Sequence, residues 1–167
     1  MQTSAVALGN ATFSDRITVN SGVLNQFIAI FYELFPNNHL SKPEKTLRLL
    51  LRNIVHASGK YYFCPSKKIV FEIDNGVLTG VYIRYRLTHH ARKRLAERFN
   101  IVPYDPSEKD LEVKIALEIV LSKPLSQREK RYLNIGETNA YRFKNRVYVI
   151  KDNSIVTVIE AFKKKRQ

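Results

Sequence analysis

Three tight-turn signals separate short runs of strand-forming residues, and they constrain the fold of this chain more than any other feature. Asn75-Gly76 lies between residues 69–73 and 77–87 and is a strong hairpin signal. Further along, Lys144-Asn145 and Asp152-Asn153 separate the runs 140–143, 146–151 and 154–162. Asn and Asp tolerate the left-handed backbone that such turns require. The sequence therefore predicts antiparallel sheet that ends in a C-terminal β-meander.

Helical spacing of apolar residues predicts helices before and between these strands. Apolar positions recur at this spacing over residues 23–35 and, after the capping-box pattern Ser41-Lys42-Pro43-Glu44, over residues 47–55. Thr88 is suited to cap a helix over 89–99, another helix is expected over 111–121, and Ser126-Gln127-Arg128-Glu129 is a second capping box. The expected fold class is α+β, with N-terminal helices and then a twisted antiparallel sheet on which the 89–99 helix packs. We expect one compact domain, with residues 1–60 as its helical part and 61–167 as its core.

The net charge of the chain points to an anionic partner. Its 28 Lys and Arg residues against 15 Asp and Glu residues leave a formal charge of +13. Much of the excess lies in residues 81–100 and 141–167, which would form one positive surface for a polyanion if the fold brings them together. The alternative is a solvated face and a charged tail, Lys163-Lys164-Lys165-Arg166. An anionic membrane is a weaker match, because no exposed basic amphipathic helix stands out.

Several classes of protein are disfavoured by what the sequence lacks. Cys64 is the single cysteine, so an internal disulfide framework is excluded, and a reducing compartment fits. No apolar stretch approaches the roughly 18 residues of a membrane helix, and Ala5-Val6-Ala7-Leu8 follows no early Lys or Arg as in a signal peptide. Metal-ligand clusters and Gly-rich phosphate loops are absent at useful spacing. We therefore expect a soluble cytoplasmic protein without a metal or cofactor.

Residues 88–99 contain the most specific motif of the sequence. On a helix, His90, Arg94 and Arg98 are four residues apart and share one face. Imidazole transfers protons near neutral pH, and guanidinium binds phosphate through two parallel hydrogen bonds. The stripe of Ala91, Leu95 and Phe99 would anchor the helix to the sheet. The alternative interpretation is a solvated basic face with a histidine at the helix start.

This motif, His-Ala-x-x-Arg-x-x-x-Arg before a meander that ends in "IVTVI", resembles small toxin-type ribonucleases. It is similar to the helix motif of the RegB endoribonuclease, within the superfamily of barnase, EndoU, the colicin nucleases and RelE. The resemblance covers residues 80–162 and implies a helix against a curved antiparallel sheet, with RNA across the open face of the sheet. It also implies metal-independent cleavage, with His90 in proton transfer and Arg94 and Arg98 on phosphate. Because the histidine is doubled, His89 is an alternative to His90.

The meander and the motif helix offer further candidate residues. Thr157 is expected to alternate with Val156 and Val158, where it would contact a phosphate or a 2′-hydroxyl or serve only as a strand residue. Tyr148 would stack a base or cover the core. The remaining candidates for substrate binding are basic side chains, and they are His89, Lys93, Arg142 and Arg146.

The leading prediction is a small basic endoribonuclease of toxin type that cuts mRNA or tRNA. The 2′-hydroxyl of the substrate would attack its own phosphodiester, with His90 as acid or base, Arg94 and Arg98 as phosphate clamps and Thr157 as an auxiliary group. An acidic antitoxin or immunity protein would be a fitting partner. Two alternatives stay open: a non-catalytic RNA- or DNA-binding regulator, and an interaction protein whose basic surface docks an acidic partner.

Overall fold

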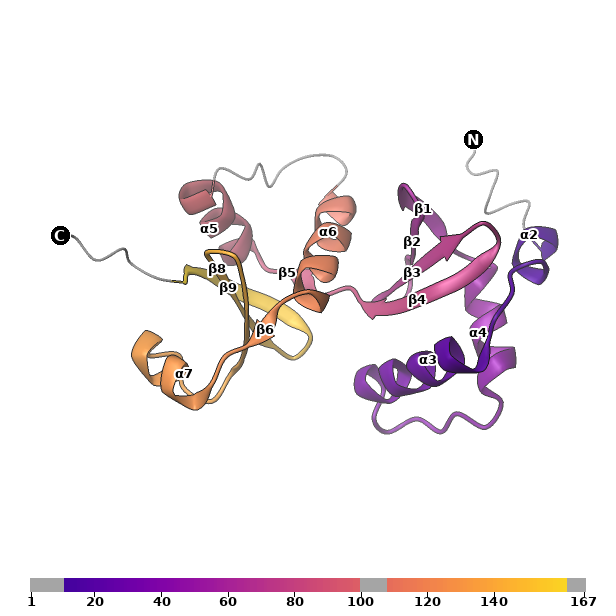
Figure 1. Cartoon of the computed structure of the whole chain (residues 1–167), viewed down its shortest axis with the longest axis horizontal. Coiled ribbons are helices and arrows are strands. Elements are labelled where there is room, and N and C mark those ends of the chain that lie inside the picture. Colours follow the sequence, from indigo (N-terminus) through magenta and orange to yellow (C-terminus); the bar gives the residue numbers. More distant parts are fainter. Residues whose placement is uncertain (1–10, 100–107, 162–167) are drawn as a thin grey trace. The chain divides into compact units, whose positions relative to one another are not determined.

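A computed structural model describes residues 11–99 and 108–161 of the chain (Figure 1). The fold is α+β, as predicted. The chain divides into two compact units, Met1–Arg84 and Tyr85–Gln167, which we call unit 1 and unit 2. The expected boundary at residue 60 does not coincide with this division. Strand β1 (Val55–Ser58) pairs with β2 (Tyr61–Cys64), so a cut between them would separate neighbouring strands of one sheet.

Unit 1 contains helices α2 (Ala11–Asp15), α3 (Ser21–Leu34) and α4 (Pro43–Leu51), which precede its sheet. Strands β3 (Ile69–Asp74) and β4 (Val77–Ile83) complete the antiparallel order β1-β2-β3-β4. The predicted turn at Asn75-Gly76 joins β3 to β4, and both residues have positive φ. Phe27 from α3, Leu47 from α4 and Phe71 from β3 share one buried core.

Two expectations for this unit were wrong. Helix α4 ends at Leu51 instead of continuing to residue 55, and Val55 begins β1 because the segment pairs with β2. The capping box expected at Ser41–Glu44 does not form, since Lys42 is the N-cap of α4 and its side chain makes no capping hydrogen bond. Cys64 is a buried free cysteine within the core.

Unit 2 begins with strand β5 (Arg86–Leu87), followed by helices α5 (His89–Phe99) and α6 (Glu108–Val120). Strand β6 (Lys123–Pro124), helix α7 (Gln127–Leu133) and the strands β7 (Asn139–Phe143), β8 (Arg146–Lys151) and β9 (Ser154–Glu160) follow. The sheet order is β5-β9-β8-β7-β6. The predicted meander is confirmed, with positive φ at Lys144, Asp152 and Asn153 in its two turns.

The sequence did not predict that residues 77–87 contribute to two sheets. Strand β4 ends at Ile83 in the sheet of unit 1, whereas β5 pairs with β9 in unit 2. The β5–β9 pair is parallel, so the second sheet is mixed and not purely antiparallel as expected. Parallel neighbours need a long connection, and here α5, α6, α7 and the first two strands of the meander lie between them.

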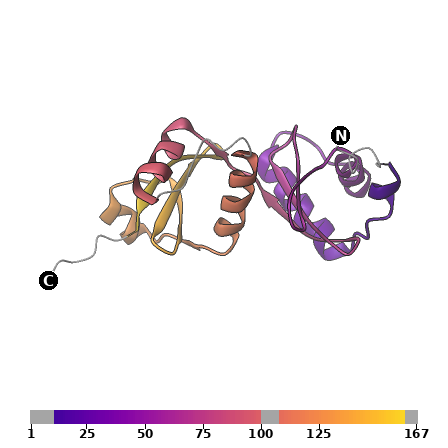
Figure 2. The same cartoon turned by 90° about the horizontal axis from the view of Figure 1, so that it is seen from above.

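The five-stranded sheet of unit 2 is covered on both faces. Ala91 and Leu95 of α5 and Ile115 of α6 pack with Tyr148 and Ile155 on one face. We call this the α5 face. On the other face, Val147 and Val149 are buried with Leu125 and Ala140, and Leu133 at the end of α7 packs against them. We call this the α7 face. Figure 1 shows α5 and α6 on one side of the strands and α7 on the other, and Figure 2 shows α5 and α6 beside the strands from above.

A β-bulge in β9 changes which side chains face each helix. Ile150 pairs with Ile155 and Val149 pairs with Thr157, so Val156 is an extra residue in β9. Ile155 and Val158 consequently lie on the same face, with Tyr148. The simple alternation expected for this strand was therefore wrong.

Some expectations fall outside the described residues: those for Ala5-Val6-Ala7-Leu8, the end of the last strand at Phe162, and the basic run 163–166. Within the described residues, no helix combines the length and the apolar composition that crossing a bilayer requires.

Candidate functional site

The start of α5 is anchored to β9 through Thr88. The Thr88 hydroxyl accepts a hydrogen bond from the backbone N–H of Ala91 at 3.1 Å, so it caps the helix as predicted. It also lies 3.0 Å from the carbonyl oxygen of Ile155, to which it donates. The backbone N–H of Thr88 donates to the same carbonyl at 3.2 Å. The first turn of α5, with His89 and His90, is therefore held in a defined position.

A buried ion pair holds α5 to α6. Arg92 lies 3.4 Å from the carboxylate of Glu112 and also donates to the carbonyl of Leu87 at 3.3 Å. Glu112 accepts a further hydrogen bond from the backbone N–H of Leu87 at 3.0 Å. A buried carboxylate requires such partners. Arg92 therefore positions α5 and does not belong to its solvent-facing surface.

Three predicted residues form a stripe on the outer side of α5, which we call the α5 stripe: His90, Arg94 and Arg98. Ala91 and Leu95 are fully buried on the adjoining side of the helix. His90 and the neighbouring His89 and Lys93 are exposed. Among the described residues, these three side chains have no hydrogen-bond or ion-pair partner. The structure thus brings an imidazole and two guanidiniums together on one anchored helix.

Both arginines of the α5 stripe already have a partner. Arg94 lies 2.8 Å from the carboxylate of Glu97, one turn along the helix. Arg98 donates to the carbonyl oxygen of Val158 in β9 at 3.4 Å. An exposed ion pair contributes at most about 1 kcal/mol, so a phosphate, which binds arginine through two hydrogen bonds, can replace Glu97.

Arg146 is partly buried and paired with other side chains of unit 2, and it is not a free substrate-binding side chain as expected. Its guanidinium is 3.0 Å from both Glu118 and the Tyr148 hydroxyl, and its Cζ lies 5.7 Å from the ring centre of Phe99 and 5.8 Å from that of Phe143. Burial lowers the pKa of Arg146, but the interactions with Tyr148 and Glu118 outweigh it and raise the pKa above its ordinary value. Arg146 therefore remains a cation, and its guanidinium donates hydrogen bonds to Tyr148 and Glu118.

Tyr148 lies in the core. Its side chain is 0% exposed and its hydroxyl donates to Glu118. Burial, followed by this hydrogen bond, raises the pKa of Tyr148 well above 10. Of the two interpretations of Tyr148, the structure therefore matches the one in which the ring covers the core, and a completely buried ring has no face on which a base can stack.

Thr157 and Arg142 lie on the α7 face of the sheet, away from the α5 stripe. Cross-strand partners share a face, and Thr157 pairs with Val149 while Arg142 pairs with Val147. Arg142 is 3.5 Å from Glu129 of α7. The expected auxiliary role of Thr157 beside His90 is therefore not supported by its position, since the bulge at Val156 turns it to the other face.

The sequence analysis did not identify the acidic residues that form ion pairs with Arg92, Arg94 and Arg146. Glu97 lies inside the motif at the helical spacing of an ion pair with Arg94. Glu112 and Glu118 occupy buried positions among the apolar residues of α6, and carboxylates in such positions signal a buried partner. The sequence did not show which residues pair with them, because Arg92 and Arg146 are far from Glu112 and Glu118 along the chain.

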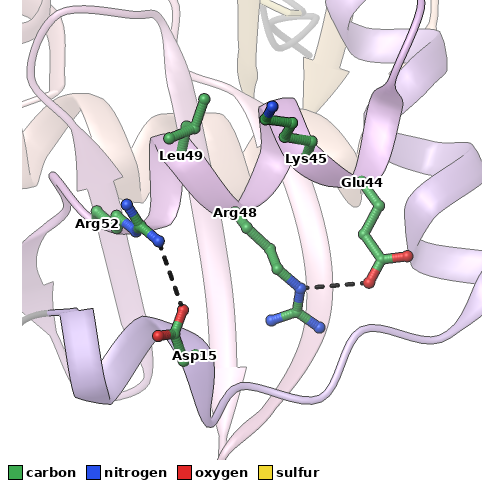
Figure 3. Close-up of a pocket in the computed structure, with 6 residues that line it drawn as sticks. All are labelled: Asp15, Glu44, Lys45, Arg48, Leu49 and Arg52. Carbon is green, nitrogen blue, oxygen red and sulfur yellow. Dashed lines mark hydrogen bonds and ion pairs between the residues drawn. The ribbon is translucent and has the colours of Figure 1, made fainter.

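One groove lies in unit 1, and none of the predicted site residues lines it. It has a volume of about 470 Å³ between α2 and α4 (Figure 3). Arg48 lies 3.2 Å from Glu44, and Arg52 lies 3.8 Å from Asp15. Because its acids and two of its cations are paired with each other, this groove has no strong charge preference. Among the described residues, no group of three or more His, Cys, Asp or Glu side chains is arranged to hold a metal ion.

Comparison with known proteins adds no relative: no family model, no curated protein and no solved structure matches the chain.

Proposed function

We propose that unit 2 binds RNA along the α5 stripe and cleaves it without a metal ion. The observation that carries the proposal is the placement of His90, Arg94 and Arg98 on the outer side of a helix whose first turn is fixed by Thr88. A fixed position of His90 is needed for catalysis, because a group that transfers protons must stay within hydrogen-bond reach of the reacting atoms.

The proposed reaction is an attack of the substrate's own 2′-hydroxyl on the neighbouring phosphodiester. A base removes the proton of the 2′-hydroxyl, the 2′-oxygen bonds to phosphorus, and the bond from phosphorus to the 5′-oxygen breaks. The 5′-oxygen takes up a proton, which leaves a 2′,3′-cyclic phosphate and a 5′-hydroxyl. His90 acts as the acid or the base, and His89 or water exchanges the other proton. Arg94 and Arg98 neutralise the charge that develops on the phosphate.

RNA binding without cleavage is the second candidate function. A catalytic histidine is ordinarily oriented by a third group, and neither His89 nor His90 has a partner among the described residues. In this alternative, which includes a DNA-binding regulator, the same basic surface supplies affinity alone. Docking of an acidic protein would use the same charges.

The proposal includes mRNA or tRNA as substrate, an acidic antitoxin or immunity protein as partner, and the cytoplasm as location. The free, buried thiol of Cys64 is compatible with a reducing compartment. An acidic inhibitor would compete with RNA for the α5 stripe, because both would use Arg94 and Arg98.

Binding and cleavage of one purified RNA by wild type and variants test the proposal. His90→Ala should lower the cleavage rate by about 10²–10⁴-fold and leave RNA binding intact. His89→Ala should lose much less; the reverse ranking would assign the role to His89. Arg94→Ala should weaken binding and reduce its salt dependence, whereas Lys114→Ala, which removes one exposed charge from α6, should change neither.

Three results decide between the candidate functions. Cleavage that His90→Ala and His89→Ala leave unchanged would contradict the catalytic proposal. RNA binding without cleavage by wild type would favour the second candidate. Binding that does not respond to salt would contradict both.

A further inference from the structure

Helix α7 presents a second basic surface, with an exposed aromatic ring at its centre. Tyr132 is 70% exposed, the second-highest exposure among the large hydrophobic side chains of the described residues. Arg128 and Arg131 are also exposed. On a helix, residues at spacings of three and four are neighbours, so Arg128, Arg131 and Tyr132 lie together. We call these three side chains the α7 triad.

The α7 triad belongs to a helix that is fixed at both ends. The Ser126 hydroxyl accepts from the backbone N–H of Glu129 at 3.1 Å, and the Glu129 carboxylate accepts from the backbone N–H of Ser126 at 2.9 Å. At the other end, Asn134 adopts the left-handed conformation and closes the helix. Leu133 packs on the α7 face of the sheet. The exposure of Tyr132 therefore reflects the position of the helix and not fraying of its end.

The single acidic residue of α7 is directed away from this surface. Glu129 is occupied by Ser126 at the helix start and by Arg142 of β7 at 3.5 Å. The exposed side of α7 thus combines two guanidiniums and a phenol ring without a competing carboxylate of its own helix. Guanidiniums bind phosphates, and an exposed ring stacks on an unpaired base.

We propose that the α7 triad is a contact site for single-stranded RNA. Tyr132 stacks on an unpaired base, and Arg128 and Arg131 bind the flanking phosphates. This inference rests on the proposed function, since it assumes that unit 2 binds RNA. The α7 triad is separate from the α5 stripe, because α5 and α7 pack on opposite faces of the sheet.

The substrate class follows from the stacking step. In double-stranded RNA the bases are stacked on each other, and a tyrosine on a helix surface reaches only the backbone and the groove edges. In a single strand or a loop, each base has a free face. The α7 triad therefore favours unpaired RNA, while its two arginines bind the backbone of either form.

Fluorescence titration of the full chain with two probes tests this site. One probe is an unpaired RNA of about 12 nucleotides, and the other is the matching duplex. Both carry 2′-O-methyl groups, so neither can be cut by attack of its own 2′-hydroxyl. The proteins are wild type, Tyr132→Ala, Tyr132→Phe, Arg131→Ala and, as a control for charge loss, Lys114→Ala.

We expect a loss of affinity that depends on the ring of Tyr132 and that affects unpaired RNA alone. Tyr132→Ala should weaken binding of the single strand by about 5- to 150-fold and leave duplex binding unchanged. Tyr132→Phe should stay within about twofold of wild type, because it keeps the ring. Arg131→Ala should weaken both probes and reduce the salt slope for the single strand by about 0.7. Lys114→Ala should match wild type.

The two proposals fail in different ways. Wild type that binds neither probe would overturn the proposed function and this inference together. Equal affinity of Tyr132→Ala and wild type for the single strand would overturn this inference alone. An equal loss of affinity for the single strand and the duplex in Tyr132→Ala would also overturn it. Circular dichroism of each variant checks that α7 still forms.

Discussion

At the scale of single residues, the arginines of α5 differ in what holds them, although their spacing in the sequence is regular. Arg92 is tied to a buried carboxylate of α6, Arg98 to a backbone carbonyl of β9, and Arg94 to Glu97 on its own helix. Of the two arginines in the α5 stripe, Arg94 is the one whose protein partner is an exposed carboxylate. A phosphate that binds Arg94 must therefore displace Glu97.

We predict that Glu97→Gln strengthens RNA binding by about two- to fivefold. The substitution removes the negative charge that competes with phosphate for Arg94. Titration with the uncleavable single strand measures the change, and Glu137→Gln, at an exposed position outside the α5 stripe, controls for the change in net charge. Equal affinity of Glu97→Gln and wild type would show that Arg94 is not a phosphate contact.

Part of the candidate site could be predicted from the sequence, because the relative positions of its residues depend only on their spacing along one helix. His90, Arg94 and Arg98 share a face of α5 as their spacing of four predicts. Arg146 was expected to bind substrate, and two interpretations of Tyr148 were open, because the position of both side chains depends on Glu118, which lies on another element. A surface arginine and a buried, paired arginine look alike in a sequence. Only the tertiary partner separates them.

At the scale of elements, most local signals were reliable, although the capping box expected at Ser41–Glu44 does not form, and the pairing of strands far apart in the sequence was not predicted. The hairpin turns, the cap of α5 and the Ser126–Glu129 capping box are all present, since each depends on a few neighbouring residues. The parallel pairing of β5 with β9 and the bulge at Val156 depend on distant segments. For this reason the position of Thr157, a candidate auxiliary group, on the α7 face of the sheet was not predicted.

The attachment of α5 gives a prediction at this scale. Thr88→Ala should lower the free energy of unfolding of unit 2 by about 1 kcal/mol, because the first turn loses its cap and its bond to Ile155. Thr88→Ser keeps the hydroxyl and should lose less. Urea denaturation measures the difference. Unchanged stability of Thr88→Ala would contradict the role of Thr88 as the anchor of the histidines.

At the scale of the whole molecule, each unit has a buried core of its own. Phe27, Leu47 and Phe71 belong to the core of unit 1, whereas Leu95 and Tyr148 belong to that of unit 2. A segment with its own hydrophobic core can fold alone. The sequence placed a boundary at the change from helical to strand-like residues. It could not show that strands β2–β4 bury their apolar faces against the helices before them.

We predict that the fragment 85–167 unfolds cooperatively and retains RNA binding. The fragment 61–167 should expose Ile69, Phe71 and Val81, which lose the cover of α3 and α4, and should aggregate. Circular dichroism during urea denaturation and size-exclusion chromatography compare the two fragments. A fragment 85–167 without a cooperative transition would contradict the division between Arg84 and Tyr85.

We propose that unit 2 cuts RNA through the substrate's own 2′-hydroxyl. Mass spectrometry of the products tests it most directly, with an RNA cut in excess EDTA and the same RNA carrying one 2′-deoxy nucleotide at the cut position. We predict a 2′,3′-cyclic phosphate and a 5′-hydroxyl from the first and no cleavage at that position in the second, because the tethered nucleophile is missing. Loss of cleavage in EDTA, or cleavage of the deoxy substrate at an equal rate, would contradict this mechanism.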